Sequence, residues 1–107
     1  MAQEQALIRT KILEFYDSVK REFPVKKILL YGSYARDEAT DDSDIDVAVV
    51  LDEKNHNQRC DIGAKLMHYA FFVDPAIEPR CVFLDEYLHP EPCSILAEIL
   101  RTGIEIV

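Results

Sequence analysis

The chain has 107 residues, of which 49% are apolar, and its formal net charge at neutral pH is −8. This length predicts a single domain over residues 1–107 with one hydrophobic core. No segment approaches the ~20 apolar residues of a membrane-spanning helix, and residues 1–5 lack the basic and apolar start of a signal peptide. We therefore expect a cytoplasmic protein that does not bind membranes.

The acidic balance argues against direct nucleic-acid binding, because proteins that bind phosphate backbones usually present a basic face. It suits a cation-binding site or a docking surface for a basic partner. The three histidines and three cysteines show no zinc-ligand spacing. We interpret Cys60, Cys81 and Cys93 as free thiols in the core or on the surface.

The predicted elements alternate between helices and strands. Apolar residues recur every three or four positions over residues 5–23, which predicts a helix that Pro24 ends. Strands are expected over residues 25–31, 45–51 and 77–84. Shorter or later helices are expected over residues 34–38, 61–72 and 94–101, with a turn or short helix over 85–89 and a short strand or tail over 104–107. This order indicates an α/β fold.

Asp44 and Asp46 stand at the start of the second predicted strand. Side chains alternate across a strand, so residues two apart lie on one face, ~6.5–7 Å from each other. Their charges repel, and a hard cation such as Mg²⁺ relieves that repulsion while also binding phosphate oxygens. Two such ions ~3.5–4 Å apart can clamp both oxygens of an in-line displacement. The pair therefore predicts a magnesium site.

Gly32 and Ser33 directly follow the first predicted strand. Glycine lets the backbone approach a ligand, and a helix that begins there directs free N–H groups toward a phosphate. If the first two strands are adjacent and antiparallel, this phosphate site meets the aspartate pair at one edge of the sheet. Arg36 is a candidate for binding the triphosphate or for an ion pair that holds the loop, and we favour the ion pair.

Each motif also has a simpler interpretation. Gly-Ser after a strand is usually a turn, and Asp-x-Asp is usually a solvated strand start. Counted from Asp42, the residues Asp44, Asp46 and Glu53 fit EF-hand spacing, but Val47 stands where that loop requires glycine. We assign the other acidic residues of this region to a solvated loop: Asp37, Glu38, Asp41 and Asp42.

Gly-Ser-x-Ala-Arg at 32–36 and Ser-Asp-Ile-Asp-Val at 43–47 occur between two apolar strands. Together they resemble the signature of the DNA polymerase β-like nucleotidyltransferase superfamily, and the short chain resembles its minimal nucleotidyltransferase (MNT) group. The resemblance is strong over residues 25–51. It implies a small mixed sheet flanked by helices, the use of Mg²⁺ and ATP, and transfer of AMP to a hydroxyl with release of pyrophosphate.

The resemblance also implies a third carboxylate on a later strand. Glu78 is the candidate, as metal ligand or as general base, because it lies at the start of the strand predicted over 77–84. Asp74 and Asp85 are its possible substitutes. The implied site comprises Asp44, Asp46 and Glu78 as catalytic residues and metal ligands, and Gly32, Ser33 and Arg36 as nucleotide-binding residues.

Members of the MNT group are often antitoxins paired with HEPN-type toxin ribonucleases. The resemblance therefore implies a toxin–antitoxin system in which this chain adenylylates or binds its partner. Larger members hold the acceptor in an additional helical domain, for which this chain is too short, so we expect a second chain to supply it. Two alternatives remain open. One is a binding module without catalysis, and the other is a nucleotidyltransferase for a small molecule such as an antibiotic, with a homodimer completing the site.

Overall fold

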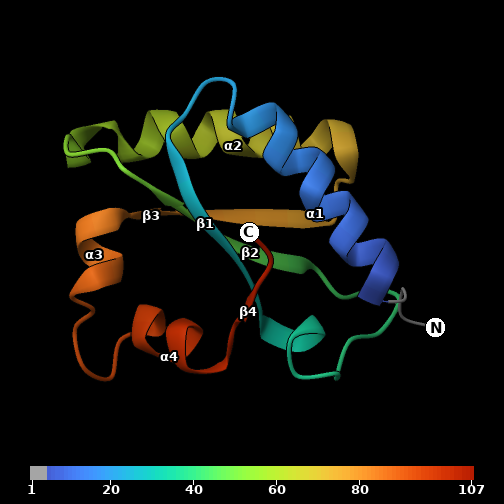
Figure 1. Ribbon diagram of the computed structural model, residues 1–107. Helices are drawn as coiled ribbons and strands as arrows, with labels where there is room; N and C mark the ends of the chain where they lie inside the picture. Colours follow the sequence, from blue (N-terminus) through green and yellow to red (C-terminus); the bar gives the residue numbers. More distant parts are fainter. Residues whose placement is uncertain (1–4) are drawn as a thin grey trace.

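The computed structural model describes residues 5–107. Residues 1–4, to which the expectation about a signal peptide refers, lie outside the described residues. A four-stranded sheet has the order β3-β2-β1-β4 (Figure 1). Its strands are Val25–Tyr31 (β1), Ile45–Leu51 (β2), Ile77–Phe83 (β3) and Ile104–Glu105 (β4). Strand β1 is antiparallel to β2 and β4, whereas β2 and β3 are parallel, so the predicted α/β class with a mixed sheet is confirmed.

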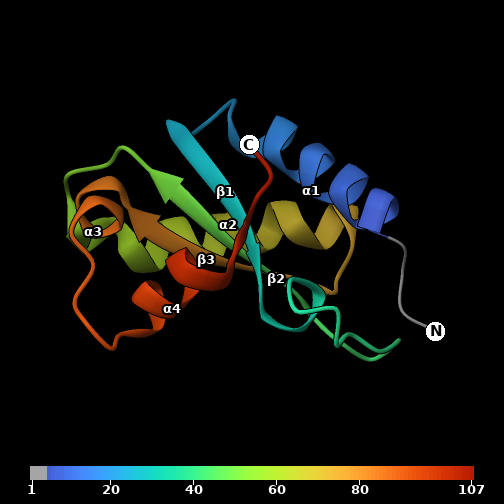
Figure 2. The same ribbon diagram turned by 60° about the horizontal axis from the view of Figure 1, so that its bottom comes forward.

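Four helices flank this sheet in two layers. They are Gln5–Val19 (α1), Arg59–Val73 (α2), Leu84–Leu88 (α3) and Ile95–Thr102 (α4), with short 3-10 turns at Gly32–Tyr34 (η1) and His56–Gln58 (η2). Helices α1 and α2 cover one face of the sheet, and α3 and α4 pack against the other, as comparison of Figures 1 and 2 shows. No helix among residues 5–107 is long and apolar enough to cross a membrane.

Two predicted helix boundaries were wrong. The first helix ends at Val19 and not at residue 23, and residues 20–22 form a turn after which the Phe23 amide still donates to the Val19 carbonyl at 2.9 Å. Phe23 still packs against the core, which explains why the apolar period continued past the helix end. The short helix expected over residues 34–38 is a 3-10 turn that begins at Gly32.

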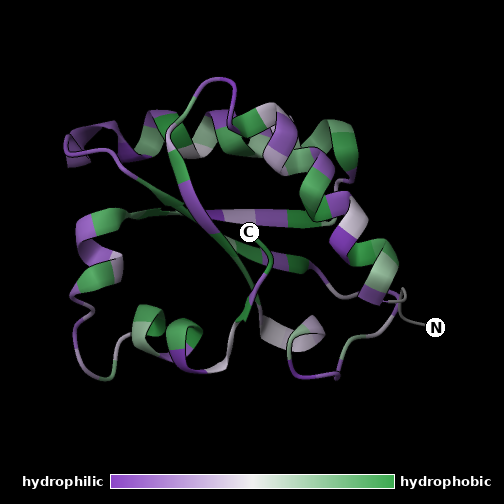
Figure 3. Ribbon diagram, in the orientation of Figure 1, coloured by the Kyte–Doolittle hydropathy of each residue, from purple (hydrophilic) through white to green (hydrophobic). Residues whose placement is uncertain are grey.

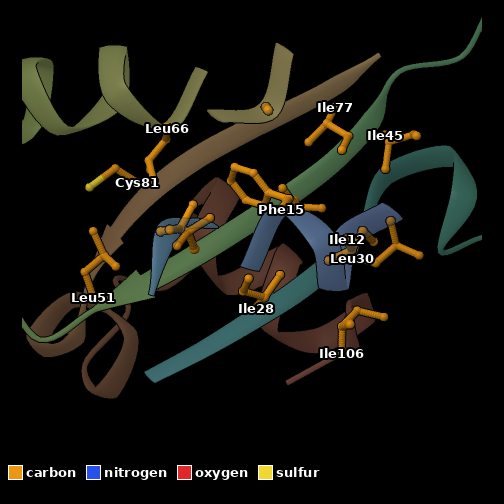
Figure 4. Close-up of a cluster of buried hydrophobic side chains, with 14 of the residues drawn as sticks. Ile12, Phe15, Ile28, Leu30, Ile45, Leu51, Leu66, Ile77, Cys81 and Ile106 are labelled. Carbon is orange, nitrogen blue, oxygen red and sulfur yellow. The ribbon is translucent and has the colours of Figure 1, made fainter. Parts of the chain in front are cut away.

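The larger core lies between the sheet and the helices α1 and α2. Figure 3 shows apolar residues along the strands and along one side of the helices, and Figure 4 shows Phe15 in the middle of this cluster. The buried residues of α1 recur at helical spacing and are Ile8, Ile12, Phe15 and Val19. The sheet presents alternate residues of β1 and β2 to this layer, among them Ile28, Leu30, Val47 and Val49.

Replacing Ile12 with alanine is expected to lower the free energy of unfolding by ~2–5 kcal/mol, because it removes buried methyl groups and leaves a cavity. Ile12 is fully buried, whereas its neighbour Leu13 is 37% exposed on the same helix. The matched control Leu13→Ala should therefore cost much less. Urea unfolding of both variants measures the difference. Equal, small costs would mean that α1 does not stabilise the sheet.

A smaller cluster occupies the opposite face, where α4 packs on the middle of the sheet. Its buried members are Leu29, Ala48, Val50, Val82 and Ile99. Helix α4 begins at Ser94, whose side chain accepts a hydrogen bond from the Ala97 amide at 3.1 Å and caps the helix. Farther along the same face, at the start of β2, the sheet carries polar side chains, and these form the candidate site.

Candidate active site

Asp46 and Glu78 are directly paired residues on the parallel strands β2 and β3. On its other side Asp46 pairs with Tyr31, the last residue of β1. Paired residues on neighbouring strands project to the same face of the sheet. The fold therefore brings Glu78 beside Asp46, although the two are far apart in the sequence.

Asp44 precedes β2 by one residue and lies two positions before Asp46. Asp44 is exposed, whereas Asp46 is half-buried. Partial burial raises the pKa of the Asp46 carboxyl, and the negative charges of Glu78 and Asp44 raise that pKa further. The three carboxylates therefore lie close enough to repel one another.

Gly32 follows β1 and has a φ of +74°, a conformation that residues with side chains rarely adopt. A Cβ atom at this position would lie 2.4 Å from the Asp46 Oδ2. The turn η1 begins here, and the first N–H groups of a helical turn have no partner within that turn. The start of this turn, at Gly32, therefore packs against the Asp46 carboxylate, and the half-buried Ser33 is the next residue of the turn.

Replacing Gly32 with alanine should displace Asp46 and impose ~1–2 kcal/mol of strain from the left-handed φ. We expect Mg²⁺ and ATP to raise the melting temperature of the unmodified protein but not that of this variant. The control is Gly63→Ala in α2, where a Cβ meets nothing within 4 Å, and which should stabilise the helix by ~0.4–1 kcal/mol. A full ligand-induced shift in Gly32→Ala would contradict the close approach.

Arg36 forms an exposed ion pair with Glu38, 3.3 Å from Nε to Oε2, which agrees with the favoured structural role. Its charge partly offsets the rise in the pKa of Asp46 that burial, Glu78 and Asp44 cause. The nearby loop residues Asp37, Glu38, Asp41 and Asp42 are exposed, as expected. The EF-hand alternative is excluded because Val47 lies within β2 and not in a ligand loop.

The two possible substitutes for Glu78 lie elsewhere. Asp74 pairs with Lys11 at 2.5 Å and accepts a hydrogen bond from the Ala76 amide at 2.8 Å. Asp85 lies in α3, beyond the far end of β3, and its carboxylate contacts His56 Nε2 at 3.0 Å. Of the three candidates, only Glu78 pairs with Asp46.

The chemistry of the donor set fits Mg²⁺. Carboxylate oxygens are its preferred protein ligands, and it usually takes one or two of them together with substrate phosphates. Within residues 5–107, no three His, Cys, Asp or Glu side chains are arranged to hold a metal ion by themselves. The carboxylates therefore offer a partial coordination sphere, and the adjoining Gly32 turn offers the place for phosphate oxygens.

The sequence patterns did not lead us to predict two further residues of this surface. Tyr31 pairs with Asp46, and Arg80 lies two residues after Glu78 on the same strand. Arg80 Nε donates a hydrogen bond to the Tyr31 hydroxyl at 3.3 Å. Side chains alternate across a strand, so Arg80 lies on the same face as Glu78. The spacing of two residues between Glu78 and Arg80 was the sequence pattern that could have identified Arg80 as part of this surface.

A mixed sheet with a glycine turn against paired carboxylates is the arrangement that the resemblance to nucleotidyltransferases implies. The family model described as "Nucleotidyltransferase domain" matches residues 12–98, which is most of the chain. The chain belongs to the nucleotidyltransferase domain family. The predicted relationship to nucleotidyltransferases and the predicted enzyme class of nucleotidyltransferase are thereby confirmed.

Two curated relatives come from Methanocaldococcus jannaschii. "Putative protein adenylyltransferase MJ0604" is 35% identical over 75 residues, covering 67% of this chain and 74% of the relative. "Putative protein adenylyltransferase MJ1379" is 53% identical over 38 residues, covering 36% of this chain and 38% of the relative. The chain therefore aligns with well under half the length of the second protein.

Solved structures share the fold at low sequence identity. A toxin–antitoxin crystallised with AMP-PNP has a TM-score of 0.55 and 21% identity, over 92% of this chain and 72% of that chain. A complex of tri-AMPylated Shewanella oneidensis HEPN toxin with MNT antitoxin has a TM-score of 0.50 and 20% identity, over 97% of this chain and 72% of that chain. At this identity they establish the fold alone.

Proposed function

We propose that this chain is a Mg²⁺-dependent adenylyltransferase that moves AMP from ATP to a hydroxyl of a partner protein. The observation that carries the proposal is the pairing of Glu78 with Asp46, directly beside the Gly32 turn. A phosphate-binding turn and several carboxylates on one face of a sheet suit transfer of a phosphoryl group by positioning and charge neutralisation.

Each residue has a distinct role in the proposed reaction. The N–H groups of the turn at Gly32 and the Ser33 hydroxyl hold the β- and γ-phosphates. Asp44 and Asp46 hold Mg²⁺, with Glu78 as a further ligand or as the base. Mg²⁺, when bound, neutralises charge on the triphosphate and on the leaving group. We propose that Arg36, which pairs with the exposed Glu38 in the structure, contacts the phosphates after leaving that partner.

The bond changes in this proposal are those of an in-line displacement. The acceptor oxygen bonds to the α-phosphorus, the bond from that phosphorus to the oxygen bridging to the β-phosphate breaks, and pyrophosphate leaves. Glu78 accepts the proton of the acceptor hydroxyl. Its carboxylate is exposed on the sheet edge beside Asp46, so an acceptor can approach it from solvent.

We infer that the acceptor is a HEPN-type toxin and that this chain acts as its antitoxin. The support is the shared fold with an MNT antitoxin bound to an AMPylated HEPN toxin, together with relatives whose names describe protein adenylyltransferases. The net charge of −8 also favours a partner with a basic surface.

The test is incubation of the protein with its cognate partner, Mg²⁺ and α-labelled ATP. We expect label to appear on the partner and to require Mg²⁺. Label from γ-labelled ATP should not be transferred, which distinguishes adenylylation from phosphorylation. A stable complex that acquires no label would instead identify a binding antitoxin without catalysis.

A further inference from the structure

Arg80 lies one row deeper on the face that carries the carboxylates. The paired residues of the first row are Tyr31, Asp46 and Glu78, and those of the next are Leu29, Ala48 and Arg80. Ala48 in the middle of the second row has only a methyl side chain. The long side chains of Tyr31 and Arg80 can therefore meet above β2, where Arg80 Nε donates to the Tyr31 hydroxyl at 3.3 Å.

The hydrogen-bond partner of Arg80 is the uncharged hydroxyl of Tyr31, whereas several other arginines of the protein pair with carboxylates. Arg36, Arg59 and Arg101 each pair with a carboxylate, those of Glu38, Glu86 and Glu98 respectively. Within residues 5–107, Arg80 forms no ion pair. A phenol orients a guanidinium without neutralising it, so Arg80 keeps its full charge and its terminal N–H groups for another ligand.

The site itself requires such a cation. A nucleoside triphosphate brings several negative charges to a surface that already has Asp44, Asp46 and Glu78. Arg80 lies two residues after Glu78 on β3, and its guanidinium donates to the hydroxyl of Tyr31, the residue paired with Asp46, so it lies beside the carboxylates at which a nucleotide would bind. Guanidinium groups bind phosphate oxygens through two parallel hydrogen bonds, and such charge-assisted bonds are about twice as strong as neutral ones.

We propose that Arg80 binds the phosphates of the nucleotide, held in position by Tyr31, from the β3 side of the site. It thereby opposes the Gly32 turn, which lies at the end of β1 on the other side of Asp46. The inference rests on the proposed function, because it assumes a nucleotide at these carboxylates. Tyr31 is a positioning residue in this arrangement and does not itself bind the phosphates.

The test measures binding and not turnover, with α,β-methylene-ATP and Mg²⁺ in isothermal titration calorimetry. Arg80→Ala should weaken binding by ~10- to 100-fold, the range for a lost hydrogen bond to a charged group. Arg80→Lys should recover part of the loss, because it restores charge without the planar fork. Tyr31→Phe should weaken binding less than Arg80→Ala, because it frees the guanidinium without removing it.

Arg21→Ala is the matched control for a lost positive charge. Arg21 is exposed in the turn before β1, at the end of the strand remote from Asp46, so its removal should leave binding unchanged. Equal affinities of Arg80→Ala and Arg21→Ala would overturn the assignment. If Arg80→Ala does not fold, unchanged binding by Tyr31→Phe and by Arg80→Lys overturns it instead. Failure of the unmodified protein to bind the analogue would contradict the proposed function as a whole. That result differs from failure of the Arg80 assignment, in which the unmodified protein binds and Arg80→Ala binds equally well.

Discussion

Glu78→Gln is expected to lower AMP transfer to the partner protein by ~100-fold or more, the scale of losing a general base. Glutamine keeps the shape of glutamate but can neither accept the proton of the acceptor hydroxyl nor contribute a negative charge to the metal site. The side chain is exposed, so folding should be unaffected. Nucleotide binding should persist through Gly32, Ser33 and the aspartate pair.

Label transfer from α-labelled ATP, measured under single-turnover conditions, gives the size of this effect. Glu14→Gln is a suitable control, because Glu14 is an exposed glutamate on α1, which packs on the opposite face of the sheet. The control should transfer AMP at the unmodified rate. Undiminished transfer by Glu78→Gln would remove Glu78 from the reaction.

The double variant Asp44→Asn, Asp46→Asn should show no increase in melting temperature on addition of Mg²⁺ and ATP. In the unmodified protein we expect these ligands to stabilise the folded state by mass action, because a ligand that binds only that state shifts the equilibrium toward it. The variant lacks the carboxylates to which we assign the cation. The loop variant Asp41→Asn, Asp42→Asn removes two adjacent exposed charges and should keep the shift. An unchanged shift in the first variant would contradict the metal assignment.

The same substitutions should raise the metal-free stability at neutral pH. Burial and the neighbouring charges of Glu78 and Asp44 raise the pKa of Asp46 in the folded state, so ionisation of Asp46 weakens that state. A raised folded pKa contributes stability at low pH that is lost as the pH rises through it. The gain from asparagine should therefore be present at pH 7 and vanish below about pH 4. Thermal unfolding in EDTA across this range measures it.

Much of the sheet could be predicted from local sequence. The bounds of β1 and β2 follow from short apolar runs between Pro24 and Gly32 and after Asp44, and the structure has the same bounds. The end of α1 could not be predicted in this way. Phe23 continues the apolar period of the helix, yet it reaches the core from a turn.

The site residues divide in the same way, into those that local sequence predicts and those that depend on contacts between distant segments. Gly32 directly follows β1, Asp44 directly precedes β2 and Asp46 lies in β2, so antiparallel pairing of these two successive strands is enough to bring them together. Glu78 required a strand that returns after α2, and its position was inferred from resemblance. The contact between Arg80 and Tyr31 spans three strands and depends on the small size of Ala48, which no local pattern reveals.

The parallel pairing of β2 and β3 has a consequence for the order in which the chain folds. Parallel neighbours need a crossover, here through α2, before Glu78 can reach Asp46. Contacts between segments that are distant in the sequence close a long loop and tend to form late. The strands β1 and β2 follow each other in the sequence, so their pairing is expected to form earlier than that of β2 and β3. With the proposed roles, a partly folded chain carries the phosphate turn and the aspartate pair but not the base. If these roles hold, we expect AMP transfer to require the docking of β3, and a chain in which β3 has not yet docked should not transfer AMP.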